Sequence, residues 1–194
     1  MTNYSNLVDQ SVEPCYNHCM NATHQYLDNS PRFIIDLSKL DDFAEILHIM
    51  QSRNVTDYVY TFIFDNVVAK YGYSARPRRQ LGERIYRQAG HLPGWSRKLW
   101  GSSGSDMRVI CEEWEQVYGK LPNRNNSLIT VVDLSNVDGR RLDSESRCKD
   151  LERWFINNHV TQFGCAPLGN KDADTKVVER RIKNQYQFDQ LFES

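Results

Sequence analysis

The sequence predicts an α+β fold, in which a small three-stranded antiparallel sheet is flanked by helices, with an N-terminal helical arm and a C-terminal helix. Two segments rich in β-branched and aromatic residues, Val55–Phe64 and Val67–Tyr71, are separated by the turn pair Asp65-Asn66, a pattern typical of a β-hairpin. Apolar residues at helical spacing precede and follow this hairpin, and a third β-rich segment is Leu128–Leu134. This order of elements is typical of one sheet with helices packed on it.

Length and composition are those of one globular domain, alone or with an appended arm. The chain has 194 residues, of which 40% are hydrophobic and 25% are charged, as in ordinary soluble proteins. We divide it into an N-terminal arm with a packing helix (1–54), a core (55–172) with an inserted loop (92–105), and a C-terminal helix (173–194). No apolar run is long enough to span a bilayer, and residues 1–10 lack the features of a signal peptide. We therefore expect a cytoplasmic protein that enters no membrane and whose five cysteines are free thiols.

The polar N-terminal arm contains a group of cysteine and histidine residues, namely Cys15, His18, Cys19 and His24. Such residues can bind zinc. Their spacing matches no established zinc pattern, and no second cysteine pair follows at a suitable distance. Unliganded residues in an irregular arm are therefore the favoured interpretation.

The first helix is predicted over Ser38–Met50, because Asp41 follows Ser38 at the offset of a capping box. One face of this helix is apolar, with Leu40, Phe43, Ile46, Leu47 and Met50. We interpret it as a packing helix without chemistry.

In the hairpin, a two-residue turn pairs Phe64 with Val67, and therefore Thr61 with Lys70. Tyr60 and Lys70 then become diagonal neighbours on adjacent strands. After the hairpin, the pattern predicts further helices over Leu81–Ala89, from Ser105 or Asp106 onward, over Ser144–Asn158 and over Thr175–Phe192. Pro93 and the glycine and serine residues around it indicate a loop over Leu92–Ser105.

Positive charge is concentrated in one stretch of the chain. Between Lys70 and Lys98 there are eight basic residues and only one acidic residue, Glu83, so this stretch carries +7. Given the net charge of −1, the rest of the chain carries −8. A basic stripe on an acidic body is typical of a localised phosphate-binding site, although a solvated basic face is the simpler alternative. Aromatic residues between the charges favour the phosphate interpretation.

Four chemically useful residues occur in an order that resembles the GIY-YIG nuclease family. Val59-Tyr60-Thr61 stands where the family has its first motif, and Lys70-Tyr71-Gly72 stands where it has the second. Arg84 then matches the arginine of the family's first helix, and Glu152 matches its single glutamate on a later helix. Asn170, after Pro167, resembles the asparagine that often follows this glutamate, so the resemblance covers about Val59 to Lys171.

The departures from the family pattern are informative. The glycine and isoleucine of the first motif are absent, and Lys70 replaces the tyrosine of the second. This lysine is similar to that of some small type II restriction endonucleases of the family. The resemblance therefore implies a sequence-specific endonuclease that cuts double-stranded DNA and binds one Mg²⁺ per active site. Because one chain holds one such centre, cutting both strands at a defined site favours a homodimer. The N-terminal arm with its helix Ser38–Met50 and the C-terminal helix are the candidate dimer surface, although both are equally compatible with covering the sheet of a monomer.

The residues themselves suit phosphodiester hydrolysis, which needs an activated water and charge neutralisation on the phosphate. Glu152 is expected to bind Mg²⁺, and Arg84 to contact a phosphate oxygen with its planar fork. Tyr60 is expected to accept the proton of the water, directly or through Tyr73. A tyrosine titrates near ~10, so this role needs a lowered pKa, which the charge of Lys70 is expected to supply.

Further residues are candidates for contacts with DNA, because they are basic, aromatic or polar and lie in the stripe, the inserted loop or the final motif. They are Arg76, Arg78, Arg79, Arg87, His91, Trp95, Arg97, Lys98, Trp100, Ser102, Ser103 and Asn170. The loop 92–105 is accordingly interpreted as a DNA-recognition loop.

Simpler interpretations stay open at each position. Glu152 is compatible with an ordinary surface glutamate, Arg84 with a solvated arginine and His91 with an exposed loop histidine. Two other functions also stay open: a structure-specific or mobile-element nuclease of the same family, and a catalytically inactive DNA-binding protein. The absence of a long linker disfavours the mobile-element type, and the four filled positions disfavour the inactive protein.

Overall fold

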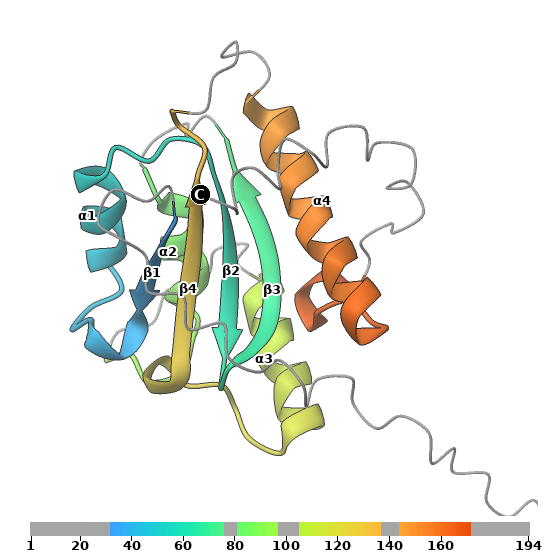
Figure 1. Cartoon of the computed structure of the whole chain (residues 1–194). Coiled ribbons are helices and arrows are strands. Elements are labelled where there is room, and N and C mark those ends of the chain that lie inside the picture. The colour runs from blue at the N-terminus through green and yellow to red at the C-terminus, as the bar shows by residue number, and fades with distance from the viewer. Residues whose placement is uncertain (1–31, 76–80, 97–104, 137–143, 172–194) are drawn as a thin grey trace, which may run out of the picture.

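A four-stranded antiparallel sheet forms the centre of the structure (Figure 1). The computed structural model describes residues 32–75, 81–96, 105–136 and 144–171. The strands lie in the order β1-β4-β2-β3, where β1 is Arg32–Asp36, β2 is Tyr58–Phe64, β3 is Val67–Ser74 and β4 is Ser127–Asp133. The α+β class is confirmed, but the prediction of three strands was one strand short.

The strand missing from the prediction is β1, at the edge of the sheet. Its five residues pair antiparallel with β4, from Arg32 opposite Val132 to Asp36 opposite Leu128. Only three of them are apolar, and a run this short gives a weak periodic signal. Pairing with β4 and burial of alternate side chains fix it as a strand.

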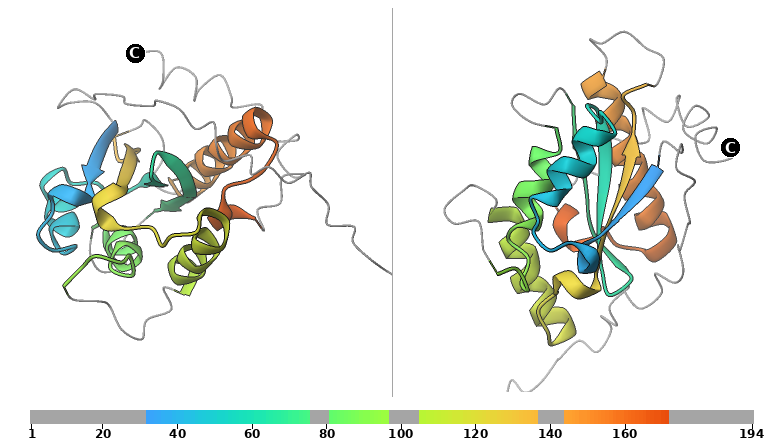
Figure 2. Two further views of the ribbon diagram at one scale, coloured as in Figure 1. Left: turned by 90° about the horizontal axis from the view of Figure 1, so that it is seen from below. Right: turned by 90° about the vertical axis from the view of Figure 1, so that its left-hand side faces the viewer.

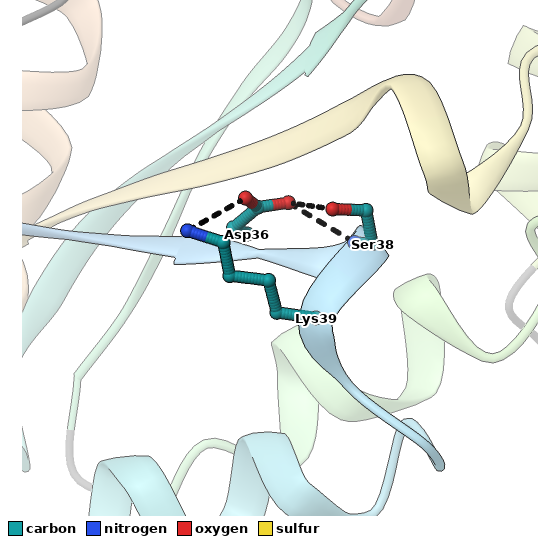
Figure 3. Close-up of polar contacts among 3 residues, drawn as sticks. All are labelled: Asp36, Ser38 and Lys39. Carbon is teal, nitrogen blue, oxygen red and sulfur yellow. Dashed lines mark hydrogen bonds and ion pairs between the residues drawn. The ribbon is translucent and has the colours of Figure 1, made fainter.

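After β1 the chain turns through the 3₁₀ helix η1 (Leu37–Lys39), which Asp36 caps. The Asp36 carboxylate accepts hydrogen bonds from the backbone nitrogen of Ser38 at 3.1 Å and from its hydroxyl at 2.6 Å. It also forms an ion pair with Lys39 at 3.4 Å (Figure 3). Partial burial raises the pKa of Asp36, but the hydrogen bonds from Ser38 and the contact with Lys39 lower it by more.

The first α-helix, α1, covers Glu45–Ser52 and begins seven residues later than predicted. Ser38 belongs to η1, and the turn just before α1 is held by the side chains of Asp42 and Glu45. The Asp42 carboxylate accepts a hydrogen bond from the Ala44 backbone nitrogen at 2.8 Å, and the Glu45 carboxylate accepts one from the Asp42 nitrogen at 2.9 Å. Most of the predicted apolar face is buried, because Leu40, Phe43, Ile46 and Met50 belong to the main core, whereas Leu47 is only half-buried.

The hairpin forms as predicted at its turn, where Asp65 and Asn66 have φ angles of 47° and 66°. The strand register differs from the prediction beyond the second pair of residues. Ala69 is an extra residue in β3, a β-bulge, so Lys70 lies opposite Phe62 and not opposite Thr61. Tyr60 therefore pairs with Gly72.

Helices cover both faces of the sheet (Figure 2). On one face lie α1, α2 (Glu83–Ala89) and α3 (Ser105–Tyr118). On the other face lies α4 (Ser144–Phe163), which extends five residues beyond its predicted end at Asn158. Two further 3₁₀ turns are η2 (Arg124–Asn126) and η4 (Leu168–Asn170). Among the described helices, none is both long and apolar enough to cross a membrane.

Candidate active site

Tyr60 occupies the centre of the candidate site, on the inner strand β2. Its side chain is fully buried, and its ring lies directly above Gly72 of β3. A Cβ atom at position 72 would lie 2.4 Å from both the Cζ and the hydroxyl oxygen of Tyr60. Only glycine leaves room for the ring there, which gives the glycine of the Lys70-Tyr71-Gly72 step a structural reason.

The Tyr60 hydroxyl is bound from α2 by two side chains one helical turn apart. The hydroxyl donates a hydrogen bond to Gln88 Oε1 at 3.0 Å. It accepts a hydrogen bond from Arg84 Nε at 3.2 Å. Because positions i and i+4 lie on one face of a helix, α2 presents both groups to the same hydroxyl.

Arg84 connects this hydroxyl to the molecular surface. The residue is exposed, and its guanidinium carbon lies 5.9 Å from the centre of the Tyr73 ring. Tyr73 points to the opposite face of the sheet from Tyr60, where it packs in the cluster formed with α4. On that side Lys149 Nζ also lies 5.9 Å from the ring centre, so two cations border Tyr73.

Glu152, on α4, acts on this group through its charge. Burial raises the pKa of its carboxyl group to about 6, and the charges of Arg84 and Lys70 lower it in part. The same carboxylate raises the pKa of both Tyr60 and Arg84, so the three side chains are electrostatic neighbours. Within the described ranges, the Glu152 carboxylate has no hydrogen bond or ion pair of its own.

Lys70 is buried at the edge of this group and contacts η4. A Cβ atom at Gly169 would come within 2.7 Å of Lys70 Cβ. The bulge at Ala69 places Lys70 of β3 opposite Phe62 of β2. Lys70 therefore lies on the same face of the sheet as Tyr60, but two residues further along. Its charge acts on Glu152.

The predicted lowering of the Tyr60 pKa by Lys70 was wrong. Complete burial raises the pKa of Tyr60, and Arg84, whose charge and hydrogen bond lower it, does not compensate. The prediction overlooked the desolvation of a phenol on an inner strand, which disfavours the charged form. Tyr60 is therefore a neutral hydroxyl near pH 7, and not a ready base.

Asn170 lies in η4 beside the edge strand β3. Its side-chain oxygen accepts a hydrogen bond from the Tyr71 backbone nitrogen at 2.8 Å, and its side-chain nitrogen donates one to the Tyr71 carbonyl at 3.1 Å. The amide thus closes this part of the sheet edge as a further strand residue would. This contact gives Asn170 a structural role, although it was expected to contact DNA.

Most of the other DNA-contact candidates lie outside the described residues: they are Arg76, Arg78, Arg79, Arg97, Lys98, Trp100, Ser102 and Ser103. The N-terminal group of cysteine and histidine residues and the helix predicted over 175–192 also lie outside them. Of the remaining three, Arg87 is exposed and forms an ion pair with Glu83 at 2.6 Å. His91 is half-buried.

Trp95 was expected to contact DNA and is instead a core residue. It is only 7% exposed, and its indole nitrogen donates a hydrogen bond to the Ala89 carbonyl at 2.9 Å. Its ring packs edge-on against Phe43, with ring centres 5.6 Å apart. The sequence placed it in a loop, but the short turn after α2 folds it back into the core.

Gln88 is the functional candidate that the sequence analysis missed. The available signal was its position four residues after Arg84 on a predicted helix, which puts both side chains on one face.

Comparisons with known proteins leave the site to be interpreted from its own chemistry. No protein-family model matches this chain, and neither the curated proteins nor the solved structures give a significant match.

The side chains of Arg84 and Glu152 are of types that suit a phosphate ester and a divalent cation. The part of the chain that the structure describes holds no group of three or more potential metal ligands. A Mg²⁺ ion can, however, be bound by one or two carboxylates while it keeps several waters. The half-buried Glu152 carboxylate suits such a cation, and the Arg84 guanidinium suits the phosphate oxygens beside it.

Proposed function

We propose that this chain is a Mg²⁺-dependent endonuclease that hydrolyses phosphodiester bonds of double-stranded DNA at a specific sequence, as a type II restriction enzyme of the GIY-YIG kind. The observation that carries the proposal is that the charges of Arg84 and Glu152, from helices on opposite faces of the sheet, act on each other and on Tyr60. Arg84 is a cation of the type that suits phosphate, and the Glu152 carboxylate has no hydrogen bond or ion pair among the described residues. Together these two side chains favour a metal-assisted phosphate reaction over a simple binding role.

Glu152 would hold the metal ion, which neutralises charge on the phosphate and lowers the pKa of a bound water. The ion is expected to bind the carboxylate form, because the pKa of about 6 leaves Glu152 ionised at neutral pH. Arg84 would bind a non-bridging phosphate oxygen with its terminal nitrogens.

The neutral Tyr60 acts on this reaction by holding Arg84, and not by accepting a proton. Tyr73 is then the better candidate for a hydrogen bond that orients the attacking water, because it lies half-exposed beside the side chains of Arg84 and Lys149, and the proton of the water would pass to solvent.

Cutting both strands at a defined site with one centre per chain favours a homodimer on a symmetric target. The helix over Ser38–Met50 is a candidate for the dimer surface, but Ile46 and Met50 of α1 are buried in the core and do not offer their side chains to a partner. The other candidate segments, residues 1–31 of the N-terminal arm and the helix predicted over 175–192, lie outside the described residues.

The test is Mg²⁺-dependent cleavage of a plasmid by the wild type and by Glu152→Gln. We expect discrete fragments from the wild type, and no cleavage but retained DNA binding by Glu152→Gln. The exposed Glu115→Gln serves as a control that keeps full activity. A smear of fragments would indicate a less specific nuclease, and DNA binding without any wild-type cleavage would indicate an inactive binding protein.

A further inference from the structure

A buried amide lies behind the candidate site. Gln88 is 6% exposed, and its Oε1 accepts the hydrogen bond of the Tyr60 hydroxyl. Arg84, one turn earlier on α2, donates its Nε–H to the same hydroxyl. Among the described residues, these are the two hydrogen bonds that Tyr60 makes through its side chain.

The chemistry of the three groups fixes the direction of both bonds. Arginine can only donate, so the Tyr60 oxygen must accept from Arg84. The single phenol proton is then free to be donated, and Gln88 Oε1 is the acceptor. If the Gln88 amide were turned round, its NH₂ group would face an oxygen that already accepts from Arg84, and the phenol proton would lose its partner.

We infer that Gln88 is a positioning residue that acts through Tyr60 to fix the direction of the Arg84 guanidinium. This inference rests on the proposed function, in which Arg84 binds a phosphate. A guanidinium is planar, so a bond held at Nε determines where its two terminal nitrogens point. An exposed arginine otherwise samples many rotamers, and holding one of them lowers the entropy lost when the phosphate is bound.

The packing around Tyr60 holds the three hydrogen-bonded side chains of Tyr60, Gln88 and Arg84 in place. Gly72 allows the Tyr60 ring to lie flat against β3, and α2 carries both Gln88 and Arg84 at helical spacing. The phenol therefore has one orientation in which both hydrogen bonds form. Gln88 touches no expected substrate position, because it lies on the buried side of the hydroxyl.

The variant Gln88→Met keeps the length of the side chain and removes the acceptor. Its effect is read in two ways: the exchange rate of the Arg84 Nε proton with water, measured by ¹⁵N NMR and assigned with Arg84→Lys, and the rate of DNA cleavage at saturating DNA. Gln88→Met and Tyr60→Phe should each accelerate exchange and slow cleavage by about tenfold, as expected for the loss of one hydrogen bond. In the double variant, Gln88→Met should add nothing to Tyr60→Phe, because it acts only through the phenol.

The exposed Gln116→Met is the matched control and should change neither readout. If Gln88→Met does not fold, Gln88→Asn withdraws the same amide by one methylene and should give the same acceleration of exchange. Unchanged Arg84 exchange in a folded Gln88 variant, or an effect of Gln88→Met that persists in Tyr60→Phe, overturns the inference. If the exchange results follow expectation but the wild type cuts no DNA, the proposed function fails and the positioning role stands.

Discussion

Tyr60 and Gly72 face each other across β2 and β3 with no space for a side chain at position 72. A Cβ atom there would lie 2.4 Å from the Tyr60 hydroxyl oxygen, well inside contact distance. The glycine thus sets the height of the phenol above the sheet, and the phenol in turn meets Gln88 and Arg84. Tyr60 and Gly72 come from two separate sequence motifs, yet they pack directly against each other.

Gly72→Ala should therefore destabilise the fold and disturb the site together. Overpacking of a core by one methyl group costs about 1–3 kcal/mol, and we expect a loss of this size in the free energy of unfolding, measured by urea denaturation. In a Tyr60→Leu background the ring is gone, so the cost of Gly72→Ala should largely disappear. Equal costs in the two backgrounds would contradict the contact.

Glu152→Gln should stabilise the protein at alkaline pH in the absence of metal. The folded pKa of about 6 lies above the ordinary glutamate pKa of 4.5, so folding favours the protonated carboxyl group. The stability that protonation supplies is fully present below pH 4.5 and is lost as the pH rises to about 6. At pH 8 the ionised group then costs about 1 kcal/mol after allowance for solvent screening.

Urea unfolding at pH 4 and pH 8 measures this effect. Glu152→Gln should gain stability over the wild type at pH 8 and little at pH 4, whereas the exposed Glu115→Gln should show no such pH dependence. A Glu152→Gln protein less stable than the wild type at pH 8 would indicate that Glu152 has a stabilising partner.

Arg84→Lys should lower the rate of DNA cleavage by about 10²-fold, as for other losses of one transition-state donor. Lysine keeps the charge but loses the planar fork and the Nε–H that the Tyr60 hydroxyl binds. Arg108→Lys, on an exposed position of α3, is the matched control. A wild-type rate in Arg84→Lys would show that charge alone is needed.

Trp95→Phe separates the core role of Trp95 from a role in DNA recognition. The variant loses the hydrogen bond to the Ala89 carbonyl and part of the packing against Phe43, and should be destabilised by about 1–3 kcal/mol. Its affinity for DNA, measured by fluorescence anisotropy while folded, should equal that of the wild type. Weaker DNA binding by a stable Trp95→Phe protein would support the prediction from sequence that Trp95 contacts DNA.

Asn170→Ala should destabilise the edge of β3 by about 1–3 kcal/mol, because two backbone groups of Tyr71 lose their partners. Amide hydrogen exchange at Tyr71 should accelerate in this variant, while exchange in β1, at the far edge of the sheet, should not. Unchanged protection of the Tyr71 amide would leave Asn170 free for a contact with DNA.

The sequence by itself determined the α+β class, the hairpin and the approximate positions of the helices that the structure describes, because these follow from local signals. The Asp65-Asn66 pair tolerates positive φ, and the apolar residues of α3 and α4 repeat with helical spacing. The edge strand β1 was missed because its formation depends on pairing with β4.

Only the tertiary structure decided how the candidate residues relate to one another. The bulge at Ala69 places Lys70 opposite Phe62, whereas a regular hairpin would place it opposite Thr61. No local sequence signal predicts this bulge. Burial reversed the expected pKa shift of Tyr60, because desolvation depends on the helices packed above it. Gln88 belongs to the candidate site because the fold places the Tyr60 hydroxyl beside it. Trp95 belongs to the core because the fold places the Ala89 carbonyl beside it.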